Sequence, residues 1–219
     1  LEEYQEKGMI KYMDLESLYV NHAKENFDLA AINNSGLLVA YDAMYGAGQN
    51  AVKRLLKNTL LLHCDYNPSF HGQAPEPIHR NLTELSELIK KDERVAVGVA
   101  NDGDADRIGM YDANGNFVDS HRIILLLIHY LHKYKGESGK VVIAFSVSEK
   151  AKKLCDAYGL PYEITKIGFK YICGKMLDGD VLIGAEESGG IAISSHIPER
   201  DGVWTVSYTH LTLPTSYAV

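Results

Sequence analysis

Short apolar runs alternate along the chain with amphipathic segments. The run 95–100 is uniformly small and apolar, which is typical of a parallel strand buried on both faces. The amphipathic segments predict helices, and Asn81 is expected to cap one of them with Glu84 as its capping-box partner. Predicted strands are 37–41, 60–64, 95–100, 108–111, 140–144, 162–165 and 181–183, and predicted helices are 52–56, 82–91, 120–134, 149–158 and 169–177.

Strands and helices that alternate with short links predict an α/β protein with parallel sheets. The pattern runs twice, and the two runs meet near Asn116. We therefore expect two consecutive three-layer α/β domains with mainly parallel mixed sheets, residues 1–117 and 118–205. The stretch 206–219 shows neither a helical period nor a partner for a strand, so we expect a non-native tail there, with an edge strand as the alternative.

Composition narrows the class of protein. The chain has 219 residues, a net charge of −7 and 46% hydrophobic residues, as an ordinary globular protein of one or two domains does. The acidic balance argues against a nucleic-acid backbone binder, which needs a basic stripe. The longest strongly apolar run, 123–128, is far shorter than the roughly 18 residues that span a bilayer. We expect a cytoplasmic protein without nucleic-acid or membrane partners.

The ends and the cysteines add two further expectations. Leu1–Tyr4 is acidic and lacks an apolar core, so it is no signal peptide, and the missing initiator Met suggests a piece of a longer protein. Cys64, Cys155 and Cys173 are scattered and form no CxxC pair. This spacing argues against a disulfide scaffold and against a zinc site built on thiolates.

The loop 101–107 carries the most informative pattern. Asp102, Asp104 and Asp106 stand at alternate positions directly after a buried strand, separated by Gly and Ala. Small spacers let the backbone curl, so the carboxylates can converge, and without a cation their repulsion would raise their pKa values. A hard divalent cation such as Mg²⁺ resolves this repulsion. The alternative is a solvated acidic turn, but the end of a central parallel strand is where α/β proteins bind ligands.

An EF-hand loop is a competing interpretation of these aspartates. It requires Gly at its sixth position and Glu at its twelfth, where this chain has Arg107 and Ala113. Arg107 is better explained as a contact to phosphate or to a sugar hydroxyl, for which its planar fork of donors is suited. An internal salt bridge to Asp106 is the alternative.

A second glycine-bounded motif, 184–190, also follows an apolar strand. Its Glu186 and Ser188 are separated by one residue. Together they can offer an acceptor and a hydroxyl to vicinal sugar hydroxyls. On its own such a segment is more often a surface turn.

Taken together, these motifs resemble the α-D-phosphohexomutases, and among them the phosphoglucomutase/phosphomannomutase enzymes. The resemblance runs in one order from about Tyr4 to Thr205. The matching segments are Asp102–Arg107, Gly168–Lys170, Gly184–Gly190 and His196–Gly202, with further support from Tyr41–Gly48 and Ala74–Pro77.

The resemblance implies a four-domain enzyme that interconverts hexose 1-phosphate and hexose 6-phosphate, with glucose or mannose as the sugar. A phosphoserine of the first domain exchanges its phosphoryl group with the substrate through a hexose 1,6-bisphosphate, which also serves as activator. This chain resembles only the second domain and most of the third. We therefore expect a fragment that is inactive without domains 1 and 4, which supply the serine and a phosphate-binding loop.

The resemblance also assigns roles at the first motif. Asp102, Asp104 and Asp106 resemble the Mg²⁺ ligands of the family, with a phosphoserine oxygen completing the shell. Arg107 resembles a residue at the junction between the phosphoserine and the sugar.

In residues 118–205, which resemble the third domain of the family, most of the implied site residues bind the sugar. Glu186 and Ser188 resemble the residues that contact sugar hydroxyls, and Gly168 lies in a turn that faces the substrate. Arg200 falls where relatives place a Lys or Arg near the reacting groups. Lys170 stands in a matching motif, and a salt bridge on a helix face explains it equally well.

Other functions remain open from the sequence. The segment 46–51 fits the G-x-G-x-x-A pattern of a dinucleotide-binding oxidoreductase, although a lone match is weak. A phosphatase that uses Asp102 or Asp104 as its nucleophile is a second alternative, and a non-catalytic metal-binding module is a third. Glucose and mannose are not distinguished, because Glu186 and Ser188 would contact hydroxyls that both sugars share.

Overall fold

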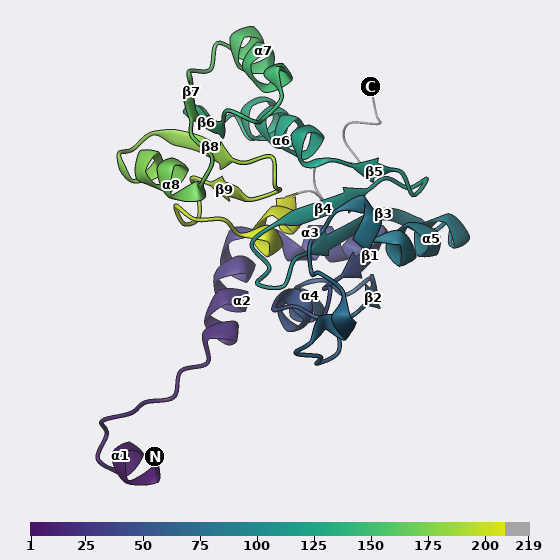
Figure 1. Ribbon diagram of the computed structural model, residues 1–219, viewed down its shortest axis with the longest axis vertical. Helices are drawn as coiled ribbons and strands as arrows, with labels where there is room; N and C mark the ends of the chain where they lie inside the picture. The colour runs from purple at the N-terminus through teal and green to yellow at the C-terminus, as the bar shows by residue number, and fades with distance from the viewer. Residues whose placement is uncertain (209–219) are drawn as a thin grey trace.

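The computed structural model describes residues 1–208 and shows two α/β domains, each built on its own sheet (Figure 1). The first sheet has the strand order β2-β1-β3-β4-β5, and the second has the order β7-β6-β8-β9. The strands are β1 Leu38–Asp42, β2 Thr59–Leu62, β3 Val95–Asn101, β4 Ile108–Tyr111, β5 Phe117–Val118, β6 Lys140–Ala144, β7 Tyr162–Thr165, β8 Val181–Ala185 and β9 Ile191–Ile193.

The two sheets follow one plan. In the first, β1 runs parallel to β2 and β3, and β4 joins β3 antiparallel. In the second, β6 runs parallel to β7 and β8, and β9 joins β8 antiparallel. The predicted fold class, two consecutive α/β domains with mainly parallel mixed sheets, is therefore confirmed.

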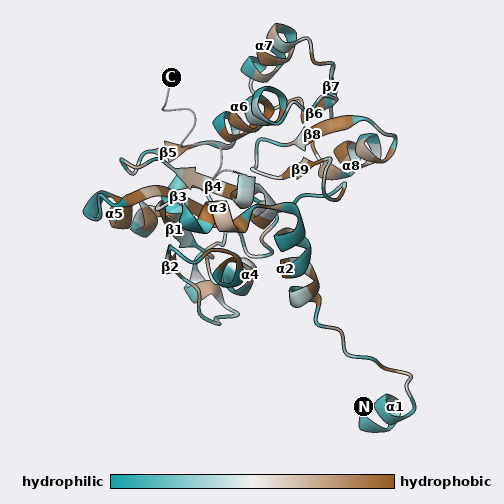
Figure 2. Ribbon diagram, turned by 180° about the vertical axis from the view of Figure 1, so that it is seen from behind, coloured by the Kyte–Doolittle hydropathy of each residue, from teal (hydrophilic) through white to brown (hydrophobic). Residues whose placement is uncertain are grey.

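Helices cover both faces of each sheet. In the first domain, α3 and α4 pack on one face and α5 on the other; in the second, α6 and α7 pack on one face and α8 on the other. Apolar residues occupy the strands and the covering faces of the helices, as the brown colour of β8 shows (Figure 2). The helices are α1 Glu2–Glu6, α2 Leu15–Asn26, α3 Leu29–Asn34, α4 Gly48–Leu55, α5 Thr83–Lys91, α6 Ser120–His129, α7 Glu149–Tyr158 and α8 Phe169–Leu177.

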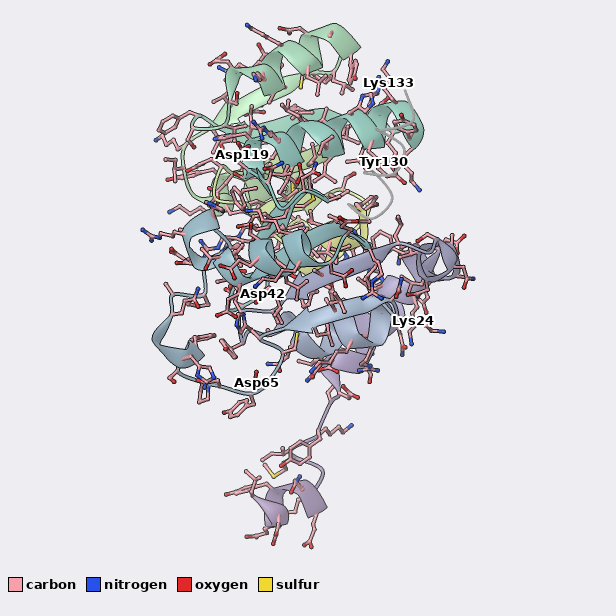
Figure 3. All side chains as sticks on the ribbon, turned by 90° about the vertical axis from the view of Figure 1, so that its right-hand side faces the viewer. Lys24, Asp42, Asp65, Asp119, Tyr130 and Lys133 are labelled. Carbon is pink, nitrogen blue, oxygen red and sulfur yellow. The ribbon has the colours of Figure 1, made fainter. Side chains whose placement is uncertain are left out.

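The hydrophobic core is shared between the domains. One continuous cluster joins Val99 and Met110 of the first sheet to Leu127 of α6 and Ile183 of the second sheet. Helix α6 begins after Asp119, whose side chain accepts a hydrogen bond from the Arg122 N–H at 2.9 Å. Figure 3 shows Asp119 and Tyr130 at opposite ends of this helix. Burying apolar surface across both domains favours a fixed arrangement of the two sheets.

The beginning of the chain lies apart from the two domains. Helix α1 contains no buried residue, and an extended segment links it to α2 (Figure 1). Helix α2 packs beside α4 of the first domain, and its Tyr19 and His22 contact Asp201 and Trp204 of the second. Among residues 1–208, no helix combines the length and the hydrophobicity that a bilayer span requires.

Several local predictions differ from the structure. Asn81 does not cap α5, because it lies in the 3₁₀ turn His79–Asn81, where its side-chain amide donates to the Glu76 carbonyl at 3.1 Å. The predicted helix 120–134 is α-helical only to His129, and a π-helical turn, Tyr130–Tyr134, follows. The segment after Gly189 contains β9, although no strand is predicted beyond residue 183.

The predicted domain boundary cuts through β5. Phe117 and Val118 both pair with β4, Val118 opposite Met110, so the first sheet extends one residue beyond 117. The boundary is displaced because this pairing, rather than the turn before it, ends the domain.

The tail that we predicted for residues 206–219 overlaps a helix of the structure. Residues 202–208 form a helix, and Val206, Ser207 and Tyr208 are buried. The ring of Tyr208 packs edge-on against Phe27 at a centroid distance of 5.0 Å. The prediction of a tail at 206–208 is therefore wrong, because packing against the first domain orders a segment without a clear helical period. Residues 209–219 lie outside the described residues.

Candidate active site

The three aspartates converge in a loop that connects β3 to β4. One carboxylate oxygen from each of Asp102, Asp104 and Asp106 lies within 4.8 Å of the others. Asp102 is buried and Asp104 exposed. Between Asp104 and Asp106, Ala105 adopts a φ of +63°, a left-handed bend that turns the backbone around the cluster. We call residues 102–107 the aspartate loop.

Neighbouring backbone and side chains hold the curvature of the aspartate loop. Asn101 accepts a hydrogen bond from the Tyr41 hydroxyl at 2.9 Å, and its amide donates to the Arg107 carbonyl at 2.8 Å. The Gly103 N–H donates to the Pro75 carbonyl at 3.2 Å, and the Gly103 carbonyl accepts from the Ala47 N–H at 3.0 Å. The loop is therefore preorganised by residues that do not carry its charge.

The glycine-rich turn after β1 packs directly on the aspartate loop. A Cβ atom at Gly46 would lie 2.5 Å from the Asp102 carbonyl oxygen, and one at Gly48 would overlap the Tyr41 hydroxyl. Gly46 is therefore needed for close approach to the aspartate loop, and Gly48 for close approach to Tyr41, whose hydroxyl supports that loop. Their spacing therefore has a packing explanation, independent of dinucleotide binding.

Two arginines lie against the aspartates. The backbone N–H of Arg107 donates to Asp102 at 3.0 Å, and its guanidinium pairs with the same carboxylate and lies 3.8 Å from Asp106. The internal salt bridge weighed from the sequence is therefore present, with Asp102 as the nearer partner. Arg200 comes from the second domain, and its guanidinium lies 2.7 Å from Asp106.

Burial and the nearby carboxylates shift the pKa of one of the three aspartates. Burial and then the charge of Asp102 raise the pKa of Asp106 to about 6, while Arg200 opposes the rise. The three candidate metal ligands are all carboxylate oxygens, which hard cations prefer. Opposite ligands of Mg²⁺ lie about 4.2 Å apart. The cluster therefore fits a divalent cation with little rearrangement.

The second motif forms the connection between β8 and β9. The backbone N–H of Glu186 donates to the Gly190 carbonyl at 2.9 Å and closes the hairpin. The Glu186 carboxylate is buried and accepts a hydrogen bond from the Gly168 N–H at 2.7 Å. Gly168 has a φ of +117°, which favours glycine. Ser188 is exposed at the tip. We call residues 186–190 the Glu–Ser loop.

The two loops meet across the domain boundary. The Ile108 N–H donates to the Gly189 carbonyl at 3.1 Å, and Arg107 and Gly190 form an isolated antiparallel bridge. Gly189 has a φ of +92°, and a Cβ atom there would lie 2.7 Å from the Ile108 carbonyl oxygen. The structure thus brings together Asp102, Asp104, Asp106, Arg107, Gly168, Glu186, Ser188 and Arg200 in two adjoining loops and their supports.

Sequence reasoning missed some residues of this region and left one open. Glu187 accepts hydrogen bonds from Ser146 at its carboxylate and from Ser120 at its carbonyl, which anchors the Glu–Ser loop to its own domain. Asp201 was also missed: its carboxylate binds Tyr19, His196 and the backbone N–H of Trp204. Its place beside Arg200 in the matching segment 196–202 was the available signal. Lys170 is exposed, with its ammonium nitrogen 5.1 Å from the ring centroid of Tyr171.

Comparison with family models agrees with this geometry. Residues 17–115 match the phosphoglucomutase/phosphomannomutase α/β/α domain II, and residues 119–211 match α/β/α domain III.

Individual relatives carry related names. The chain is 28% identical over 93% of its length to a phosphoglucomutase/phosphomannomutase of Thermococcus kodakarensis, of which it covers 45%. It is 30% identical over 86% of its length to a phosphoglucosamine mutase of Carboxydothermus hydrogenoformans, of which it covers 42%. A solved Thermus thermophilus structure, assigned as a phosphomannomutase, superimposes with a TM-score of 0.85 at 32% identity, covering 93% of this chain and 48% of that one.

The chain spans about half the length of these relatives. The two family models follow each other without overlap and together include both loops of the site and every strand of the two sheets except β5. The chain therefore belongs to the phosphoglucomutase/phosphomannomutase family and comprises its domains II and III.

Proposed function

We propose that this chain supplies the metal-binding and sugar-binding loops of a mutase that transfers a phosphoryl group between O1 and O6 of a hexose. The observation that carries the proposal is the meeting of three converging carboxylates with the Glu–Ser loop across the domain boundary. Relatives named as phosphoglucomutase, phosphomannomutase and phosphoglucosamine mutase support a hexose phosphate as the substrate class.

In this proposal, Asp102, Asp104 and Asp106 hold Mg²⁺. When bound, the cation supplies neutralisation of the negative charge on the transferring phosphoryl group. The raised pKa of Asp106 supports this assignment, because burial and the charge of Asp102 disfavour its ionised form, and a bound cation would favour that form.

The remaining side chains would bind and orient the sugar phosphate. Arg107 and Arg200 carry guanidinium groups beside the aspartates, and guanidinium forks suit phosphate oxygens. One oxygen of Glu186 is occupied by the Gly168 N–H, which fixes the carboxylate and leaves its other oxygen to accept from a sugar hydroxyl. The exposed hydroxyl of Ser188 would contact a neighbouring hydroxyl.

The phosphoryl carrier is proposed to lie in other domains of the enzyme. The family resemblance assigns a phosphoserine to domain 1 and a phosphate-binding loop to domain 4, with hexose 1,6-bisphosphate as intermediate and activator. Metal and sugar contacts cannot replace a covalent carrier, so the chain by itself should not interconvert hexose phosphates.

Cation binding can be measured on the chain itself by calorimetric titration with Mg²⁺. Replacing Asp104 with Asn should lower the affinity at least about ten-fold, because one of three anionic ligands is lost. Asp65→Asn is the matched control, since Asp65 is exposed and stands outside the cluster. Equal affinities for the wild type and Asp104→Asn would contradict the metal assignment.

The activity requires the whole enzyme that contains this sequence. It should be assayed with the 1-phosphates of glucose, mannose and glucosamine, each with its bisphosphate activator, and the preferred sugar would identify the substrate. We expect Asp104→Asn to abolish conversion and Asp65→Asn to retain it. Turnover by the purified chain alone would show that the nucleophile lies within it, contrary to the proposal.

A further inference from the structure

Asp201 is the centre of a hydrogen-bonding cluster beside the proposed active site. Its carboxylate accepts from the backbone N–H of Trp204 at 2.8 Å and from the Tyr19 hydroxyl at 2.9 Å, and it pairs with His196 Nε2 at 2.9 Å. Its own N–H donates to the Ile191 carbonyl at 3.1 Å. A carboxylate held by this many donors has a defined position.

The donors come from both ends of the described chain. Tyr19 lies on α2, 182 residues before Asp201, whereas His196 and Trp204 flank Asp201 in the second domain. Burial and then the charge of Asp201 raise the pKa of Tyr19 well above its ordinary value. The hydroxyl therefore remains protonated and can donate to the carboxylate.

Helix α2 packs against the same segment with ring contacts. His22 stacks on Trp204 at a centroid distance of 5.1 Å, and Phe27, just after α2, meets the indole edge-on at 4.7 Å. The His196 ring stacks nearly parallel on Trp204 at a centroid distance of 3.8 Å, and it also stacks on His22 at 5.3 Å. Tyr19 and His22 are three residues apart, so they share one face of the helix.

Arg200 directly precedes Asp201, so the hydrogen bonds of Asp201 restrain the backbone from which the Arg200 side chain extends. The Arg200 guanidinium is 2.7 Å from Asp106 and its central carbon is 5.4 Å from the ring centroid of Phe169. On the other side of Asp201, the Gly202 N–H donates to the Ala105 carbonyl at 3.0 Å. Segment 200–202 is thus held between α2 and the aspartate loop.

We propose that Tyr19 and His196 are positioning residues that, through Asp201, hold Arg200 against Asp106. Helix α2 thereby controls how much positive charge stands at the carboxylate cluster. This inference rests on the proposed function for its consequence at the metal site, but the geometry it claims concerns only this chain's residues. Releasing Arg200 removes a cation that competes for Asp106, so it should strengthen binding of Mg²⁺.

The position of Arg200 can be observed directly by NMR of its side-chain Nε–H in the ¹⁵N-labelled, metal-free chain. Arg200→Gln assigns the signal, because that signal alone disappears. In Tyr19→Phe, which removes only the hydroxyl, we expect the signal to move toward that of an exposed arginine. Tyr66→Phe is the matched control, since Tyr66 is 86% exposed. An unmoved signal in Tyr19→Phe overturns the proposal.

His196 is tested with the same signal. His196→Ala should displace the Arg200 signal in the same direction as Tyr19→Phe. His196→Gln should displace it less, because the glutamine amide can still donate to Asp201. Emission of Trp204, the single tryptophan of the chain, reports whether the stacked rings stay in place. An unchanged Arg200 signal in His196→Ala overturns the role of His196.

A double-mutant cycle tests the consequence for the cation. Tyr19→Phe should raise the Mg²⁺ affinity two- to five-fold, and the same change in an Arg200→Gln background should have no effect. A general loosening of the fold would act alike in both backgrounds, and that result overturns the proposal. If the chain binds no Mg²⁺ at all, the proposed function loses its metal, while the Arg200 signal still decides the positioning roles.

Discussion

The aspartate loop and the Glu–Ser loop occupy equivalent places in two domains of the same plan. Each leaves the last parallel strand of its sheet, β3 or β8, and enters an antiparallel neighbour, β4 or β9. They differ in the surroundings of their carboxylates. The buried Glu186 carboxylate of the Glu–Ser loop accepts a hydrogen bond from the Gly168 N–H. In the aspartate loop three carboxylates lie together, and the pKa of Asp106 is raised.

The comparison shows that the fold places the two loops, whereas their side chains determine what each loop can bind. The shared topology determines where a loop can meet its counterpart, because the connections to both antiparallel strands lie at the domain boundary. The side chains of each loop then determine which ligand it favours. Unbalanced negative charge favours a cation, while a fixed carboxylate with a free acceptor site favours hydroxyl groups.

The largest change in stability is expected from replacing a glycine of one loop, compared with a glycine of the other. Gly189→Ala should destabilise the chain by about 2 to 3 kcal/mol, because its φ is +92° and the new Cβ meets the Ile108 carbonyl. Gly103→Ala should cost about 1 kcal/mol or less, since its nearest neighbour is the Pro75 ring at 3.1 Å. Urea unfolding measures both. Equal costs would mean that the contact between the loops is not rigid.

Removing one supporting hydroxyl from each loop gives a smaller effect. Tyr41→Phe leaves the buried side-chain amide oxygen of Asn101 without its donor and should cost about 2 kcal/mol. Ser146→Ala removes the partly buried donor to Glu187 and should cost about 0.5 to 1 kcal/mol. Unfolding midpoints of the two variants test this order. A reversed order would show that the Glu–Ser loop is the more tightly anchored.

The strand ends behind the two loops predict different responses to pH. Asp42 ends β1 and pairs with His63 at 3.0 Å, whereas β6 ends at Ala144. The hydrogen bond to Asp42 raises the pKa of His63, and the charge of Glu84 adds to the rise. Protonated His63 therefore stabilises the fold below its ordinary pKa of about 6.5, and this contribution is lost as pH rises through the higher folded-state value.

His63→Gln isolates this contribution. The stability difference between wild type and variant should shrink as the pH rises from about 6.5 through the higher folded-state pKa of His63, as followed by urea unfolding. His129→Gln serves as a histidine control in the second domain. A difference that stays constant over this range would falsify the assignment to the Asp42–His63 pair.

The smallest expected effect concerns the tip of the Glu–Ser loop. Ser188 is exposed, so Ser188→Ala should change the stability by less than about 0.5 kcal/mol. In the whole enzyme, loss of its hydroxyl should raise KM for the hexose phosphate, because a contact to the sugar disappears. A clear loss of stability in the chain would instead indicate a structural role for this serine.

Much of the fold was predictable from short-range patterns. The strands 108–111, 140–144 and 162–165 and the helices 149–158 and 169–177 have the predicted bounds, because apolar periodicity and terminal residues act within a few positions. The convergence of Asp102, Asp104 and Asp106 was predictable for the same reason, since small spacers and the end of a buried strand are local features.

Tertiary structure alone decided the partners. Arg200 reaches Asp106, Tyr19 reaches Asp201, and Tyr208 orders the end of helix 202–208 by packing on Phe27. No local pattern specifies these contacts, because they join segments that the shared core brings together from distant parts of the chain. Periodicity determines which face of an element is apolar, but only packing determines which element that face meets, and hence which charges stand together at the site.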